Sequence, residues 1–218
     1  MFGPMFIQTI CAYTIPLLFA ITLHEVAHGW MAYRLGDPTA KRMGRLTINP
    51  INHIDPVGTL LVPGVLFIMS ALSGGFMPVF GWAKPVPVNP MNFRGNWRQK
   101  FALTAVAGPL CNLLQAIGWV LLLKLIFMLG IYEDFFFEVA KAGVAVNLML
   151  MAFNLIPLPP LDGGNIVLHL LPAPLARVYD RITPYGQWIL LGLLMFGLLH
   201  YVAYPFIVFG KWVVSLVI

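Results

Sequence analysis

Long apolar stretches separated by short polar segments dominate this sequence. A helix that crosses a membrane needs about 20 apolar residues, and three of the stretches reach that length. They are residues 5–33, 101–130 and 136–156. Turn-forming residues follow each stretch, beginning with Gly36-Asp37-Pro38, Gly130 and Pro157. The pattern therefore predicts three long helices.

Other apolar regions contain helix-breaking residues. Residues 57–73 are short for a full crossing and contain Pro63-Gly64, and the prolines within residues 74–92 favour extended backbone. We therefore expect a re-entrant or extended segment between the first helix and the middle core helix. Residues 186–217, interrupted at Pro205, predict either one long tilted helix or two shorter pieces.

The composition places these helices in a membrane. Of the 218 residues, 60% are hydrophobic and 10% are charged, whereas a soluble domain averages about 45–50% apolar and about 25% charged residues. A soluble enzyme, a disordered protein and a secreted disulfide scaffold are excluded. We expect an all-α polytopic membrane protein. Residues 1–218 should form a single membrane-embedded domain, with a core at roughly 5–171 and a C-terminal membrane segment at 186–217.

Basic residues gather in two of the polar segments. Residues 34–55 and 84–100 are rich in Lys and Arg, whereas residues 131–138 are acidic. Lys and Arg collect in the cytoplasmic loops of membrane proteins, so the net charge of +5 indicates orientation rather than nucleic-acid binding. We expect the N-terminus outside and both basic loops in the cytoplasm.

The sharpest chemical signal is His24-Glu25-Val26-Ala27-His28. On an α-helix, residues four apart lie on one face, about 6 Å apart along the axis. Two imidazoles at this spacing can bind one cation, and catalytic zinc takes three protein ligands plus water. Glu25 is placed to accept a proton from that water. A chance occurrence of the motif is a poor alternative, because such residues inside an apolar span are costly without partners.

The third metal ligand has several candidates. They are His53, Asp55, Asp162, His169 and His200. Asp162 has the best context, because it follows a proline-rich break, and unwound backbone at membrane depth is tolerated only where it lines a protein cavity. Its alternative role is to cap the helix that begins at Gly163-Gly164.

A shared metal also constrains the topology. His24 and His28 lie near the C-terminal end of the first helix, and Asp162 lies just past the end of the 136–156 helix. These two helices should therefore run parallel, with the 101–130 helix antiparallel between them, and the metal should lie toward the cytoplasmic half.

Two amides in apolar helices, Asn112 and Asn154, also need partners. Either can stabilise the oxyanion or hold the substrate backbone. Alternatively, each can serve as a hydrogen-bonding contact between helices. Both interpretations stay open at this point.

Three motifs in this order resemble the site-2 protease family of intramembrane zinc metalloproteases. They are the HExxH of the first helix, Gly108-Pro109-Leu-Cys-Asn112, and NLIPLPPLDGG at residues 154–164. Residues 44–59 and 81–90 are similar to the compact bacterial subgroup that lacks a PDZ domain. The resemblance covers roughly residues 15–170. It implies zinc ligands at His24, His28 and Asp162, and Glu25 as the catalytic base.

The resemblance implies a zinc-dependent metalloendopeptidase in the bacterial plasma membrane. Such an enzyme cleaves within or near transmembrane segments of membrane-protein substrates. The expected partners are that substrate and the lipid bilayer, with no nucleic acid, and a homo-oligomer or a regulatory membrane partner stays open. The alternative is a membrane metal-binding protein or transporter without hydrolysis. A transporter has no evident need of Glu25 beside two ligating histidines.

Overall fold

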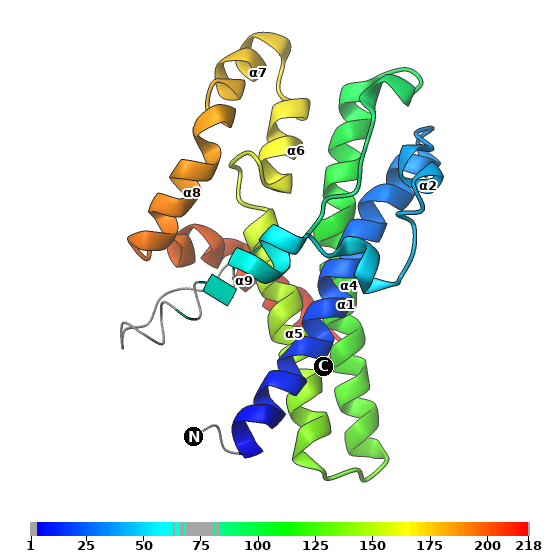
Figure 1. Cartoon of the computed structure of the whole chain (residues 1–218), viewed down its shortest axis with the longest axis vertical. Helices are drawn as coiled ribbons and strands as arrows, with labels where there is room; N and C mark the ends of the chain where they lie inside the picture. The colour runs from blue at the N-terminus through cyan, green and yellow to red at the C-terminus, as the bar shows by residue number, and fades with distance from the viewer. Residues whose placement is uncertain (1–3, 63, 66–67, 69–80, 82, 218) are drawn as a thin grey trace.

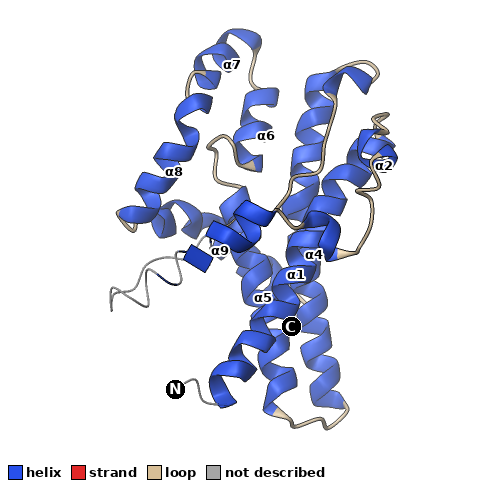
Figure 2. Cartoon of the chain, viewed as in Figure 1, coloured by secondary structure: helices blue, strands red, loops and turns tan. Residues whose placement is uncertain are grey.

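Three long helices form the centre of the molecule. The structure is a computed structural model that describes residues 4–62, 64, 65, 68, 81 and 83–217. The long helices are α1 (Pro4–Arg34), α4 (Trp97–Met128) and α5 (Asp134–Asn154). Figure 1 shows α1 and α5 running in one direction and α4 in the other. This arrangement confirms the predicted parallel pair. Figure 2 shows helices throughout the described chain and no strand, which confirms the predicted all-α class.

Small residues line the contacts between these three helices. The fully buried alanines include Ala20 of α1, Ala116 of α4 and Ala140 of α5. At Gly143 of α5, an added Cβ would overlap the indole ring of Trp119. Small side chains let helix backbones approach closely, as is common in membrane proteins. The helix contacts are therefore typical of a membrane bundle.

Large apolar side chains lie on the outside. Leu114 is 60% exposed and Met149 is 68% exposed. Within the described residues, α4 and α5 are long and apolar enough to cross a membrane, and the bent pair of residues 173–195 and 199–215 would add a third crossing. The sequence analysis also predicted a helix of spanning length at residues 5–33, but α1 is not one of the two helices that meet this criterion.

Among the described residues between α1 and α4, four short helices and turns have defined bounds. They are α2 (Thr39–Arg42), the 3-10 turns η1 (Pro50–His53) and η3 (Pro90–Asn92), and the π-helical turn η2 (Pro56–Leu61). The central part of the predicted re-entrant or extended stretch, residues 66–67 and 69–80, lies outside the described residues. Its described end, residues 83–89, contains no helix. The middle helix begins four residues earlier than predicted because Asn96 caps it, its side chain accepting a hydrogen bond from the Gln99 N–H.

Five short elements follow α5. They are α6 (Asp162–Leu170), α7 (Ala173–Asp180), η4 (Thr183–Tyr185), α8 (Gly186–Met195) and α9 (Leu199–Ser215). The sequence analysis did not predict α7. Pro172 is its N-cap residue and Pro174 lies in its first turn, where a helix needs no N–H donor.

The last apolar stretch forms two pieces, but they do not divide at Pro205. Pro205 lies inside α9, and the break lies at Gly197, which has a φ of 69°. The Gly197 and Leu198 N–H groups donate to the carbonyls of Leu194 and Leu193. This Schellman arrangement closes α8 and needs a left-handed residue that glycine adopts easily. The helices on either side of the break differ in direction by 91°.

Candidate metal centre

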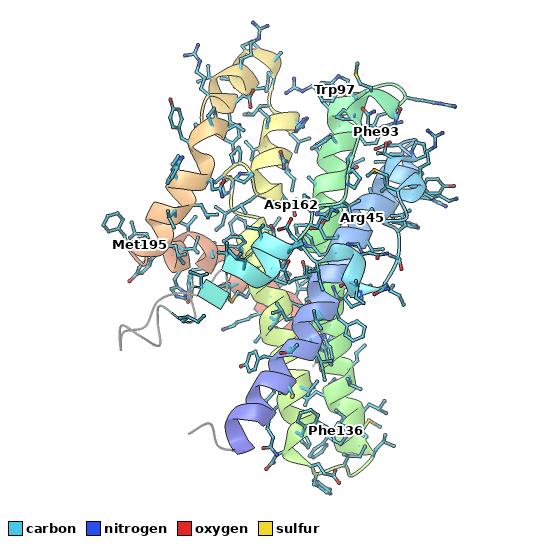
Figure 3. The ribbon with its side chains drawn as sticks, in the orientation of Figure 1. Arg45, Phe93, Trp97, Phe136, Asp162 and Met195 are labelled. Carbon is cyan, nitrogen blue, oxygen red and sulfur yellow. The ribbon has the colours of Figure 1, made fainter. Side chains whose placement is uncertain are left out.

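The structure brings His24 and His28 of α1 together with Asp162 of α6. The two Nε2 atoms lie 3.0 Å apart. Asp162 Oδ2 lies 3.2 Å from His24 Nε2 and 3.3 Å from His28 Nε2. In Figure 3, Asp162 lies at the lower end of α6, where that helix faces α1 and α4. Three ligand-type atoms from two distant parts of the chain therefore meet at one point.

Asp162 is positioned by a close approach between the start of α6 and the chain segment that leads into it. Prolines end α5, and α6 begins directly at Asp162. A Cβ on Gly163 would overlap the carbonyls of Leu155 and Ile156, and one on Gly164 would overlap the backbone of the same returning stretch. The glycine pair therefore lets α6 start against the chain that leads into it. Leu161 is the N-cap residue of α6, and Asp162 is the first residue of the helix, so Asp162 does not occupy the capping position of the alternative role.

The far end of α6 is also held. Arg98, in the first turn of α4, donates through Nη2 to the carbonyls of Leu168 and Leu171, at 2.8 and 2.9 Å. These are orphan carbonyls at the C-terminal end of α6, where a cation is favourable. Both ends of α6 are therefore fixed relative to α4 and α5.

The hydrogen bonds of the two imidazoles define where their protons lie. His24 Nδ1 lies 2.6 Å from Asn112 Oδ1, and His28 Nδ1 lies 2.7 Å from the carbonyl oxygen of Thr104. Both oxygens can only accept, so each Nδ1 carries the proton of a neutral imidazole. Both Nε2 lone pairs are then directed toward Asp162.

This donor set fits zinc. Asp162 Oδ2 is buried and has no hydrogen-bond donor. It faces two nitrogens that also carry lone pairs, an arrangement that requires a cation. Tetrahedral zinc with ligand bonds of about 2.0–2.1 Å places its ligand atoms about 3.3 Å apart. The separations of 3.0, 3.2 and 3.3 Å match that spacing.

Two buried amides support His24 from behind. Asn112 of α4 donates to the Ala20 carbonyl and to Asn147 Oδ1, and Asn147 of α5 donates to the Gly143 carbonyl. Both asparagines are fully buried. Hydrogen bonds to the second nitrogen of a ligating histidine fix its ring orientation. Three helices therefore share one chain of hydrogen bonds that ends at His24.

Gly108 gives the imidazoles room. An added Cβ at this position would overlap the rings of both His24 and His28. No other residue type fits against the imidazole pair without moving them or α4. Gly108 is therefore part of the metal centre although it has no side chain.

Glu25 has a different type of partner. Its Oε2 accepts a hydrogen bond of 2.8 Å from the backbone N–H of Val86. Val86 lies between Pro85 and Pro87, which have no N–H to donate. The carboxylate beside the metal centre is thus tied to the irregular segment that leads into η3.

Comparison with known proteins identifies the family. A curated relative from Bacillus subtilis, named "Putative zinc metalloprotease YwhC", is 38% identical over 202 residues, which are 90% of this chain and 86% of the relative. This chain belongs to the site-2 protease family. Two relatives named "Putative zinc metalloprotease Rip2" are more distant. The one from Mycolicibacterium smegmatis is 30% identical over 78% of this chain, and the one from Mycobacterium tuberculosis is 29% identical over 82%.

The two Rip2 relatives are longer proteins. The chain spans 60% of the first and 63% of the second. No family model matches the chain, and no solved structure matches it.

The other candidate metal ligands lie elsewhere. His53 Nε2 bonds the Thr47 carbonyl, and Asp55 accepts hydrogen bonds from the backbone at the start of η2. His169 bonds the Asn165 carbonyl and stacks on an aromatic ring of α4. In the part of the chain that the structure describes, the triad is the one group of such side chains close enough to share a metal.

The two asparagines that the sequence analysis selected have different surroundings. Asn112 contacts His24, and the protons of its amide go to Ala20 and Asn147. Asn154 donates to the Leu150 carbonyl of its own helix. The oxyanion and substrate roles stay predictions for both residues, while the geometry gives Asn112 the additional role of orienting His24.

The sequence analysis missed four contributors to the site. Asn147 is an amide in an apolar helix, and the argument that selected Asn112 would also have selected it. Gly108 was noted only as part of a motif. Thr104 and Val86 act through backbone atoms, for which side-chain chemistry gives no signal.

Proposed function

We propose that this site-2 protease is an intramembrane zinc metalloendopeptidase that hydrolyses peptide bonds within or near transmembrane segments of other membrane proteins. One observation carries the proposal: three buried or half-buried lone-pair atoms of His24, His28 and Asp162 face one another at 3.0–3.3 Å, and Asp162 Oδ2 lacks any donor. The names of the relatives, as zinc metalloproteases, support the same conclusion.

The depth of the metal centre supports a substrate inside the bilayer. His28 bonds to Thr104, and the imidazoles contact Gly108. These residues lie seven and eleven positions after the start of α4 at Trp97, which is about 10–17 Å along a helix. The metal centre therefore lies within the length of a helix that is suited to crossing the membrane.

The chemistry divides between the metal and the chain. When bound, zinc lowers the pKa of a coordinated water and polarises the scissile carbonyl. The Glu25 carboxylate takes up the proton and returns it to the leaving amine. The Val86 N–H, at 2.8 Å, holds that carboxylate in place. His24 and His28 present their Nε2 atoms because Asn112 and Thr104 hold each Nδ1 proton.

The orientation follows from charge. The basic segments 34–55 and 84–100 adjoin the C-terminal end of α1 and the N-terminal end of α4. The metal centre is nearer to these ends than to the acidic turn before α5. By the positive-inside rule, the active site lies in the cytoplasmic half of a bacterial plasma membrane.

The test separates base from ligand by two isosteric substitutions. Glu25→Gln should keep its zinc, while cleavage of co-expressed single-span proteins falls by about 10²–10⁴-fold, the usual contribution of a general base. Asp162→Asn should lose zinc, because a neutral amide is a poorer ligand than a carboxylate. Zinc content and cleavage are measured in parallel on both purified variants and the unmodified protein.

The same preparations address the alternative of a metal transporter. Glu25→Gln protein that cleaves at the unmodified rate would remove Glu25 from the mechanism. Zinc flux into proteoliposomes that depends on His24 and Asp162 but not on Glu25, without any cleavage, would favour transport instead.

A further inference from the structure

Arg45 is a buried cation without a counter-charge. The residue is 7% exposed. Nη2 donates to the Lys84 carbonyl at 2.7 Å and approaches the Pro85 carbonyl at 3.5 Å, while Nε is buried without a partner. All eight acidic residues of the chain lie in the described part. None of them forms an ion pair with Arg45. Burial of an unpaired charge is costly, and a bound anion would reduce that cost for this guanidinium.

The local fold places Arg45 at this position. The Gly44 N–H donates to the Lys41 carbonyl, and the Arg45 N–H donates to the Ala40 carbonyl. With a φ of 67° at Gly44, these bonds form a Schellman motif at the end of α2. The chain therefore turns sharply after α2 and directs the segment that carries Arg45 back toward residues 84–85.

A polar hollow of about 440 Å³ lies beside this guanidinium. Arg45, Lys84 and Asn52 supply its donor groups, and no acidic side chain lines it. Met43 and Ile51 also line it and are 62% and 70% exposed. The hollow thus combines two cations and an amide with an exposed apolar rim.

We propose that this hollow binds a phosphate group. A guanidinium offers a planar fork of donors that matches phosphate oxygens, and a lysine adds a second positive charge. The group can come from the headgroup of an anionic phospholipid or from free phosphate in solution. The exposed apolar rim at Met43 and Ile51 favours the lipid source, because such side chains suit the boundary between headgroups and acyl chains.

The observations that favour a phosphate site do not involve the proposed hydrolysis, although Arg45 and Glu25 contact the same segment of the chain. The carbonyls that Arg45 holds belong to Lys84 and Pro85, and the next residue, Val86, donates to Glu25. A bound phosphate group would therefore share Arg45 with the segment that contacts the carboxylate.

The experiment compares three single-charge variants with the unmodified protein. Lys84→Gln removes an exposed charge from the hollow and leaves the backbone contacts of Arg45 in place. Arg45→Gln removes the buried charge, and its folding is checked by thermal unfolding. Arg42→Gln is the matched control, because it removes the same charge from an exposed residue next to the hollow that does not line it.

Native mass spectrometry in detergent tests the lipid source by measuring the binding of phosphatidylglycerol and phosphatidylcholine. The unmodified protein should retain one phosphatidylglycerol in preference to phosphatidylcholine. Its affinity should fall about twofold to fivefold in Lys84→Gln and about tenfold or more in Arg45→Gln, and stay unchanged in Arg42→Gln. Thermal unfolding with inorganic phosphate measures the other source, since a free anion that binds this site should stabilise the unmodified protein more than Lys84→Gln.

A preference for phosphatidylglycerol that weakens in Lys84→Gln would support a phosphate site for a lipid headgroup. Stabilisation by inorganic phosphate that weakens in Lys84→Gln would support a site for free phosphate. Equal losses in Lys84→Gln and Arg42→Gln would show diffuse surface attraction and overturn the proposal. The absence of both the lipid preference and the stabilisation by phosphate would also overturn it.

Discussion

The candidate metal centre has two sides that are built differently: a metal side with the two histidines, and a base side with Glu25, the proposed base. On the metal side, His24 and His28 are held from within the helix bundle by Asn112 and Thr104, and Gly108 sets the helix separation. On the base side, Glu25 is held by one N–H from a segment that lies outside the long helices. The metal side is thus fixed by helix packing, whereas the base side depends on how a connecting segment is anchored.

That segment is anchored by side chains at the end of α1 and beyond. Asp37, which is fully buried, accepts hydrogen bonds from the Asn89 N–H at 2.6 Å and from Asn92 Nδ2 at 2.7 Å. Arg45 holds the carbonyls at the other end of the segment. Changes on the metal side should therefore remove zinc, and changes on the base side should reduce the rate or the stability while zinc stays.

The largest effect is expected from Gly108→Ala. The added methyl group would overlap both imidazoles, so zinc content should fall to near zero and cleavage with it. Gly118→Ala on the same helix is the control, because a Cβ there meets nothing within 4 Å. Zinc is measured by elemental analysis of both purified variants. Normal zinc content in Gly108→Ala would show that the metal does not lie between these rings.

The next effect concerns the amide chain behind His24. Asn112→Leu removes the acceptor for His24 Nδ1, and loss of such a partner typically lowers metal affinity or activity by about 10–100-fold. Competition with a zinc chelator measures the affinity. Asn154→Leu should leave the zinc affinity unchanged, because the Asn154 amide donates to the Leu150 carbonyl of its own helix. A loss of cleavage in Asn154→Leu with full zinc would support its predicted role toward substrate.

A smaller effect should follow on the base side. Val86→Pro removes the N–H that donates to Glu25 and should lower kcat about threefold to tenfold, the usual net contribution of one intramolecular hydrogen bond. Val86→Ala keeps that N–H and controls for loss of the side chain. Zinc content should be unchanged in both. If the two variants have equal rates, the hydrogen bond makes no contribution to catalysis.

The smallest effect concerns stability and pH. Burial alone would raise the pKa of Asp37, but hydrogen bonds from Thr39, Asn92 and Asn89 outweigh it and hold the pKa below its usual value. A depressed carboxyl pKa stabilises the folded state above the unfolded pKa of about 3.9, and this stabilisation is lost as the pH falls toward the folded value.

Asp37→Asn should therefore lower the free energy of unfolding by about 1–2 kcal/mol at neutral pH. Thermal unfolding in detergent between neutral pH and about pH 3 measures it, with the unfolded pKa of about 3.9 inside that window. The difference between the variant and the unmodified protein should shrink in acid. A difference that stays constant with pH would assign the effect to shape rather than to charge.

The sequence predicted most of the metal side. The i, i+4 spacing of His24 and His28 determines their common face on any helix, and the proline break before Asp162 marks where a chain can line a cavity. The parallel direction of α1 and α5 followed from requiring one metal. These features depend on local periodicity and on the number of crossings, which a sequence displays directly.

The base side and the C-terminal region were harder to predict. The contact of Glu25 with Val86 joins residues 61 positions apart through a backbone atom, so no residue type marks it. Pro205 was the predicted break in the last apolar stretch. Instead, α8 ends before Gly197, because Gly197 adopts the positive φ that the Schellman arrangement requires.

Because α6 is anchored at both ends, its length in residues affects the orientation of Asp162 relative to the two imidazoles. Arg98 holds the last carbonyls, the glycine pair holds the first turn, and Asp162 is the first residue of the helix. Each residue of an α-helix turns the chain by about 100°. Deleting or inserting one residue between these anchors would rotate the Asp162 carboxylate away from the imidazoles even if every side chain were kept. The number of residues in α6 therefore determines the direction in which the Asp162 carboxylate points.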